Sequence, residues 1–126
     1  MSVLLIAEHN NKELRPFTLN AATAASQIDD DVHAIIIGQN CSDAAKALSD
    51  LPLIKKVIQV EAAYYENFVA ENFSPVIVKL DENYSHIVCS ANTFGKNLMP
   101  RIAAALDTSQ ISDITKVISA DTFLRP

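Results

Sequence analysis

Val3-Leu4-Leu5-Ile6-Ala7 is an unbroken apolar run that begins at the third residue of the chain. Such a run is typical of a β-strand that is covered on both faces, as the strands of a parallel sheet are. It is too short for the apolar core of a signal peptide, and no basic residues precede it. The run therefore predicts a buried first strand.

Strand-like and helix-like segments alternate along the rest of the chain. Four more strands are predicted, at Val32–Gly38, Lys56–Val60, Ile87–Ala91 and Ile114–Ser119. This alternation predicts an α/β fold with a mainly parallel sheet, in which right-handed crossovers place helices on both faces. We therefore expect one domain over residues 1–126, built as a three-layer sandwich.

Two helices are expected in the first half of the chain. Pro16 should open the first, which closes after Ile28 and turns an apolar face that includes Phe17 toward the sheet. Ser42 should cap a short second helix that runs through Leu48.

In the second half, prolines mark the expected helix starts. Ala62–Phe73 has helical spacing, and Ser74 with Pro75 is suited to the N-cap and first turn of a further helix. Pro100 lies in the last helical segment, where a proline is tolerated only near the start because an N–H there is unpaired anyway. We expect that helix to begin shortly before Pro100.

Composition excludes several functional classes. The chain has 126 residues and a net charge of −5 at pH 7, so it lacks the basic character of nucleic-acid binders and of proteins that bind anionic lipid. No stretch approaches the apolar length of a membrane span. Cys41 and Cys89 are expected to be reduced thiols rather than a disulfide framework. We predict neither nucleic-acid binding nor membrane insertion.

No pattern indicates a catalytic or metal site. CxxC and HExxH are absent. Glu8 and His9 could act as an acid–base pair, but neighbouring residues at a strand end point in opposite directions, which favours a polar loop. Cys41 is predicted in a loop and could be reactive, but no base is identifiable near it. We therefore predict no catalytic residues and no metal.

Ligands of a parallel sheet bind beyond the carboxyl ends of its strands. The predicted loops there are Glu8–Asn11, Gly38–Asn40 and Asn92–Asn97. Gly38 and Gly95 are the only glycines, so neither the GxGxxG fingerprint nor the P-loop is present. The sequence therefore does not predict a glycine-rich phosphate cradle.

The turn Thr93–Asn97 is the sharpest local motif. At a helix N-terminus, free N–H groups and Lys96 would favour an anion such as a nucleotide phosphate. The same residues fit a tight turn in which Gly95 has positive φ and Asn97 caps the helix, and this interpretation is favoured. Arg101 could be a second anion ligand or an interface charge, and the interface interpretation is favoured. The candidate interface or weak anion site comprises Phe94, Gly95, Lys96, Asn97 and Arg101.

As a set, these residues resemble the N-terminal domain of the electron transfer flavoprotein alpha subunit in residue identity, order and spacing. The similarity covers essentially the whole chain, and its strongest part is Thr93–Ala104. The other similar segments are Val3–His9, Leu19–Ala21, Thr23–Ala25, Ile111–Asp113 and Ser119–Pro126.

The resemblance implies a fold and a function. The fold is expected to be Rossmann-like, of the nucleotide-binding type found in adenine nucleotide alpha hydrolases. The family is a heterodimer of alpha and beta subunits that carries electrons from acyl-CoA and other dehydrogenases to a membrane quinone oxidoreductase. Its FAD lies mainly in the C-terminal domain of the alpha subunit, with help from the beta subunit, which holds an AMP. The alpha N-terminal domain is expected to be a scaffold against beta.

The resemblance also implies limits on this chain. Family members continue after Arg125 and Pro126, which are expected to mark the hinge into the FAD domain, so no FAD residue can be carried over. We expect part of an electron carrier rather than an enzyme, with no cofactor in this chain alone. Its location is expected to be the bacterial cytoplasm, or the mitochondrial matrix for a mature eukaryotic form. The alternative function is a small AMP- or ATP-binding module of related fold.

Overall fold

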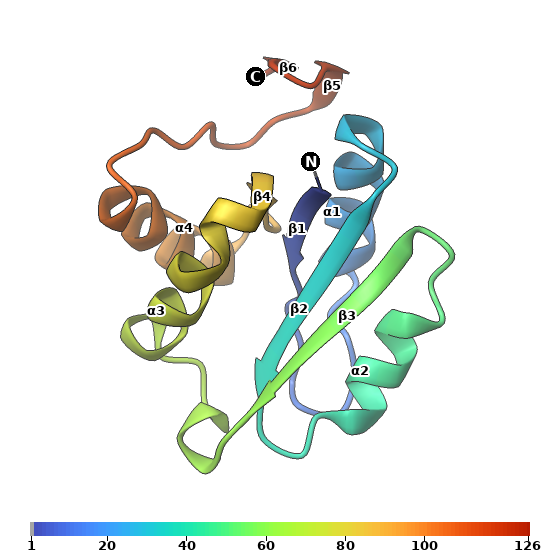
Figure 1. The fold of residues 1–126 in the computed structure, drawn as a ribbon, viewed down its shortest axis with the longest axis vertical. Helices are drawn as coiled ribbons and strands as arrows, with labels where there is room; N and C mark the ends of the chain where they lie inside the picture. The colour runs from blue at the N-terminus through green and yellow to red at the C-terminus, as the bar shows by residue number, and fades with distance from the viewer. Residues whose placement is uncertain (1) are drawn as a thin grey trace.

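The computed structural model describes residues 2–126 (Figure 1). Strands and helices alternate as the sequence predicts, which confirms the α/β class. In chain order the elements are β1 (Ser2–Ile6), α1 (Phe17–Ile28), β2 (Val32–Gly38), α2 (Ser42–Ser49), β3 (Ile54–Glu61), the 3₁₀ turn η1 (Ala63–Tyr65), α3 (Ala70–Leu80), the 3₁₀ turn η2 (Asp81–Asn83), β4 (Tyr84–Val88), α4 (Thr93–Ala105), β5 (Lys116–Ser119) and β6 (Thr122–Leu124).

The first four strands form one parallel sheet in the order β3-β2-β1-β4. Leu5 of the central strand β1 pairs with Ala34 of β2 on one side and with Val88 of β4 on the other. The chain therefore leaves β1 toward one edge of the sheet and later returns to its opposite side. The carboxyl end of β1 is the switch point at which sheets of this kind bind ligands.

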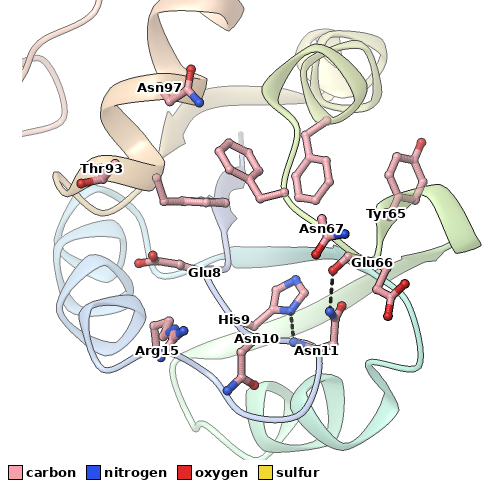
Figure 2. Close-up of a pocket in the computed structure, with 13 residues that line it drawn as sticks. Glu8, His9, Asn10, Asn11, Arg15, Tyr65, Glu66, Asn67, Thr93 and Asn97 are labelled. Atoms are coloured by element: carbon pink, nitrogen blue, oxygen red, sulfur yellow. Dashed lines mark hydrogen bonds between the residues drawn. The ribbon is translucent and has the colours of Figure 1, made fainter.

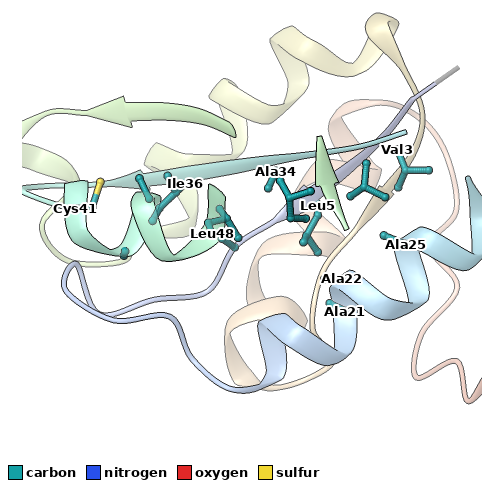
Figure 3. Packing of buried hydrophobic residues seen from close by; sticks show 14 residues of the cluster. Val3, Leu5, Ala21, Ala22, Ala25, Ala34, Ile36, Cys41 and Leu48 are labelled. Atoms are coloured by element: carbon teal, nitrogen blue, oxygen red, sulfur yellow. The ribbon is translucent and has the colours of Figure 1, made fainter. Parts of the chain in front are cut away.

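Helices cover both faces of the sheet and give the expected three layers (Figure 1). Val3 and Leu5 point into a core with α1 and α2, whereas Leu4 and Ile6 point into a second core with α3 and α4. Figure 3 shows the first core, where alanines of α1 allow the helix to lie close to the strands. Burial on both faces explains why the strands are unbroken apolar runs rather than alternating ones.

The prediction that α1 buries Phe17 is wrong. Phe17 is 56% exposed, and the buried face is instead Thr18, Ala21, Ala22 and Ala25. The Thr18 hydroxyl accepts from the Glu8 amide at 3.0 Å and donates to the Glu8 carbonyl at 2.9 Å. These two bonds turn Thr18 toward the sheet, which leaves Phe17 facing solvent.

The cap predicted for α2 is also wrong. Ser42 lies inside the first turn, and the N-cap position is Cys41, whose side chain makes no cap hydrogen bond. The carboxylate of Glu61, at the end of β3, accepts from the Cys41 amide at 2.9 Å. A neighbouring strand thus supplies the anion at this helix N-terminus, which is favourable on electrostatic grounds.

Both prolines lie inside helices rather than at their starts. α3 begins at Ala70 and runs through Pro75. The segment predicted as a separate earlier helix, Ala62–Phe73, instead contains the turn η1 and, from Ala70, the first residues of α3. α4 begins at Thr93 and runs through Pro100. A proline removes one intrahelical hydrogen bond, but buried neighbours such as Ile77 and Leu98 hold both helices against the sheet.

The fifth predicted strand forms, but it lies outside the parallel sheet. β5 pairs with β6 in a separate antiparallel hairpin. The hairpin contacts α1 through β5, as Figure 1 shows. Asp107 and Asp113, both with positive φ, lie in the non-helical segment between α4 and β5, so no helix carries the chain back to the sheet edge. β4 also begins earlier than predicted, at Tyr84.

Candidate functional site

A cleft of about 470 Å³ opens at the carboxyl edge of the sheet, beside the end of β1 (Figure 2). Its volume lies within the usual range for small-molecule sites. The lining residues come from the loop after β1, from η1 and the segment that follows it, and from α3 and α4: Glu8, His9, Asn10, Asn11, Arg15, Tyr65, Glu66, Asn67, Phe68, Phe73, Thr93, Phe94 and Asn97.

A side-chain hydrogen bond joins the two loops that meet at the switch point. Glu8 accepts from the side-chain amide of Asn92, and at 3.4 Å from the Ser90 hydroxyl. The side-chain oxygen of Asn92 accepts from the backbone N–H of Gly95 at 3.3 Å and caps α4. Asn92 thus satisfies an unpaired N–H of the helix and positions Glu8 at the cleft.

His9 is held in one tautomer by backbone groups. Its Nδ1 accepts from the Asn11 amide at 2.9 Å, so Nε2 carries the proton and donates to the Ile37 carbonyl at 2.8 Å. Burial lowers the pKa of His9, while the Ile37 bond and the charge of Glu8 partly oppose that change. Both ring nitrogens of a neutral imidazole are therefore occupied, which supports the polar-loop interpretation over an acid–base pair.

Asn11 connects three loops at the floor of the cleft. Its side-chain nitrogen donates to the Glu66 carbonyl at 2.7 Å, and its side-chain oxygen accepts from the backbone N–H of Gln39 at 2.9 Å. Its φ of 75° is one that asparagine tolerates. A Cβ at Gly38 would lie 2.5 Å from the Asn11 oxygen, so glycine there makes the close approach possible.

An aromatic cluster lines part of the cleft. The ring centroids of Phe68 and Phe94 are 4.6 Å apart, and those of Phe68 and Phe73 are 5.0 Å apart. Tyr65 packs edge-on against Phe73. No pattern in the sequence indicates this cluster, because its members come from different elements that meet only in the folded chain.

The detailed geometry predicted for the Thr93–Asn97 turn is wrong. No glycine has positive φ among residues 2–126, and Gly95 lies within α4. A Cβ on Gly95 would lie 1.8 Å from the Ser90 carbonyl oxygen, so this glycine permits close helix–strand packing. Asn92, rather than Asn97, caps the helix.

The structure does not bring all the predicted interface or anion residues together. Phe94 and Asn97 line the cleft. Lys96 lies 3.8 Å from Asp113, and Arg101 pairs with Glu71 at 2.9 Å, so neither charge lines the cleft. At the expected hinge, the Nε of Arg125 donates to the Ser112 carbonyl at 2.9 Å, and the exposed Pro126 follows it.

The cysteines are free thiols with little tendency to ionise. Burial, reinforced by Glu61, raises the pKa of Cys41 to about 11, and burial raises that of Cys89 to about 12. In the part of the chain that is described, no three His, Cys, Asp or Glu side chains converge as metal ligands. None of the helices over residues 2–126 combines the length and apolarity that crossing a bilayer requires.

Comparison with known proteins identifies one family. The family model described as "Electron transfer flavoprotein domain" matches residues 3–126. A Pseudomonas aeruginosa protein named electron transfer flavoprotein subunit alpha is 45% identical over 126 residues, which are 100% of this chain and 41% of that protein.

Two further relatives give the same picture. The Bradyrhizobium diazoefficiens protein of the same name is 42% identical over 100% of this chain and 40% of its own length. The mitochondrial alpha subunit of Dictyostelium discoideum is 41% identical over 98% of this chain and 37% of its own length. The chain thus spans about two fifths of the length of the curated relatives it matches.

Proposed function

Because the chain belongs to the electron transfer flavoprotein family, we propose that it is the N-terminal scaffold domain of the alpha subunit of such a carrier. The observation that carries the proposal is the family match over residues 3–126, together with 45% identity along the whole chain to a protein named as that subunit. The proposed complex is an FAD-containing heterodimer that carries electrons from acyl-CoA and other dehydrogenases to the respiratory chain.

The described residues do not fit the FAD of this complex, which supports placing the flavin elsewhere. The turn between a strand and a helix that cradles a dinucleotide pyrophosphate needs glycines, and residues 7–16 after β1 contain none. The space beside Gly38 is filled by His9 and Asn11, and that beside Gly95 by the Ser90 carbonyl.

The proposed direct partner is the beta subunit, and dehydrogenases and a quinone oxidoreductase interact with the complete complex. The protein acts as part of an electron carrier rather than as an enzyme. Relatives named from bacteria and from mitochondria support a location in the bacterial cytoplasm or the mitochondrial matrix.

The outer face of α4 is the proposed interface with the beta subunit. The side chains of Lys96 and Arg101 are 63% and 50% exposed, and their ion pairs within the chain are surface pairs that contribute little to stability. Both are therefore free to exchange partners in a complex. Phe94 and Asn97 continue this proposed surface to the cleft, whereas Gly95 is buried and holds α4 close to the strand. Arg125 with Pro126 is the proposed hinge.

The test is capture of the native complex from source cells with an antibody against this domain. Mass spectrometry is expected to find a beta subunit in amounts equal to the captured chain. Capture of the chain without any beta subunit would contradict the proposal.

The alternative, a small AMP- or ATP-binding module, is favoured by one observation: the cleft lies at the switch point of the sheet. Isothermal titration calorimetry with AMP and with ATP tests it. Heat of saturable binding would support this alternative, and the absence of binding heat at millimolar nucleotide would contradict it.

A further inference from the structure

We propose that the cleft receives an arginine side chain from a partner protein, with Glu8 binding the guanidinium and Phe68 and Phe94 contacting its flat face. The proposal rests on the proposed function in one respect: it takes the beta subunit to be the protein that supplies the arginine.

Glu8 lies at the cleft with no cationic partner among the described residues. Its carboxylate is half-buried and accepts from Asn92 and Ser90, which are both neutral donors. Among the described residues Glu8 takes part in no ion pair, although Arg15 lines the same cleft. A positioned, half-buried carboxylate without a cation gains strong charge-assisted hydrogen bonds from a guanidinium supplied from outside.

Aromatic rings line the same cleft as Glu8. Phe68 and Phe94 are half-buried and line the cleft, so parts of their rings remain accessible from it. Guanidinium groups stack on aromatic faces better than ammonium groups do, and their planar fork matches a carboxylate. A carboxylate and aromatic rings around one cleft therefore favour arginine over lysine.

The charge balance of the cleft also favours a cation. Glu8 and Glu66 supply two carboxylates, Arg15 supplies one guanidinium, and His9 is neutral, so the lining carries a net charge of −1. The whole chain carries −5. This balance attracts a cation and repels the phosphates of AMP or ATP.

Polar side chains around the cleft favour an arginine that belongs to a protein. The side chains of Asn67, Thr93 and Asn97 are exposed around the cleft and make no hydrogen bond within the described residues. They can therefore bond a partner's backbone around the buried side chain, as polar rims of protein interfaces do. The bonds of His9, Asn11 and Asn92 hold the loops in place beforehand, which lowers the cost of binding.

The test is an NMR titration of the ¹⁵N-labelled 126-residue chain with N-acetyl-L-arginine amide. Saturable shifts are expected at the backbone amides of Asn11, Phe68 and Phe94. The uncharged isostere N-acetyl-L-citrulline amide is expected to bind about tenfold more weakly, because it lacks the charge that strengthens the bond to Glu8.

Variants isolate the two proposed contacts. Glu8→Gln keeps an acceptor for Asn92 and is expected to abolish the preference for arginine over citrulline. Glu82→Gln makes the same charge change on exposed η2, at the amino edge of the sheet, and is expected to retain that preference. Phe94→Leu keeps apolar volume but removes the ring face, and is expected to weaken arginine binding with Glu8 intact.

Equal responses to the arginine and citrulline compounds, or no response, would overturn the proposal. It would also be overturned if AMP shifted the resonances of the same backbone amides at a lower concentration than the arginine compound does, because that would favour a nucleotide site. None of these results affects capture of the beta subunit by the native chain. Conversely, arginine-selective shifts from a chain that captures no beta subunit would support the site and contradict the proposed function.

Discussion

The carboxylate of Glu8, just after β1, accepts a hydrogen bond from the side-chain amide of Asn92, which is the N-cap of α4. The two residues belong to the loops that leave neighbouring strands at the switch point. The side chain of Asn92 therefore caps α4 through its oxygen and binds Glu8 at the cleft through its nitrogen. Stability and the geometry of the candidate site are coupled at this residue.

Replacing Asn92 by alanine is expected to lower the free energy of unfolding by about 1–2 kcal/mol, because both the cap and the bond to Glu8 are lost. Urea denaturation measures the change. The matched control is Asn97→Ala, which removes the same side chain from an exposed position and is expected to change stability by less than about 0.5 kcal/mol. A larger loss from Asn97→Ala than from Asn92→Ala would contradict the assignment of the cap.

Gly95→Ala is expected to destabilise the protein by more than about 2 kcal/mol, although alanine normally favours a helix over glycine by about 1 kcal/mol. The new Cβ would lie 1.8 Å from a backbone oxygen of Ser90, which a side-chain rotation cannot relieve. Thermal unfolding followed by circular dichroism provides the measurement. An unchanged or raised melting temperature would show that α4 does not pack as closely as described.

His9 is expected to make stability depend on pH. Its folded-state pKa is lowered from the ordinary value of 6.5, chiefly by burial, so the unfolded chain binds the proton more readily. The contribution of neutral His9 is therefore fully present above about pH 6.5 and declines as pH falls toward the lowered folded-state pKa.

Urea unfolding of the wild type and of His9→Gln at several pH values between about 5 and 7.5 isolates this contribution, because His33 and His86 are common to both proteins. The stability difference between them is expected to shrink as pH falls. A difference that grows at low pH would mean that the folded state favours the protonated imidazole.

Both thiols are expected to resist modification in the folded protein. Their pKa values, about 11 for Cys41 and about 12 for Cys89, leave almost no thiolate near neutral pH. A disulfide reagent such as dithionitrobenzoate is expected to label them slowly in buffer and rapidly in urea. Labelling of native Cys41 at the rate of a free cysteine would restore the reactive-thiol interpretation.

The order and type of the main elements were predictable because burial on both faces leaves a direct mark on sequence. β2 spans Val32–Gly38, as its apolar run predicts. Helix starts were less predictable, since the local rule for proline competes with tertiary packing. The cost of a missing hydrogen bond at Pro75 or Pro100 is offset by the buried residues beside each proline.

The candidate site was predictable only in outline. The rule for parallel sheets located the loops Glu8–Asn11 and Asn92–Asn97, and the cleft lies between them. The hydrogen-bond partners of these loops could not be predicted from the sequence. His9, for example, bonds the backbone carbonyl of Ile37, and every residue carries such a carbonyl. The position of β5 also depends on turns whose effect appears only in three dimensions.

The most direct test of the proposed function is a visible absorption spectrum of the native complex captured through this domain. A flavin spectrum from a complex that contains a beta subunit is the expected result for a domain of the electron carrier. A colourless preparation in which this chain is the only protein would contradict that account and favour the nucleotide-binding module.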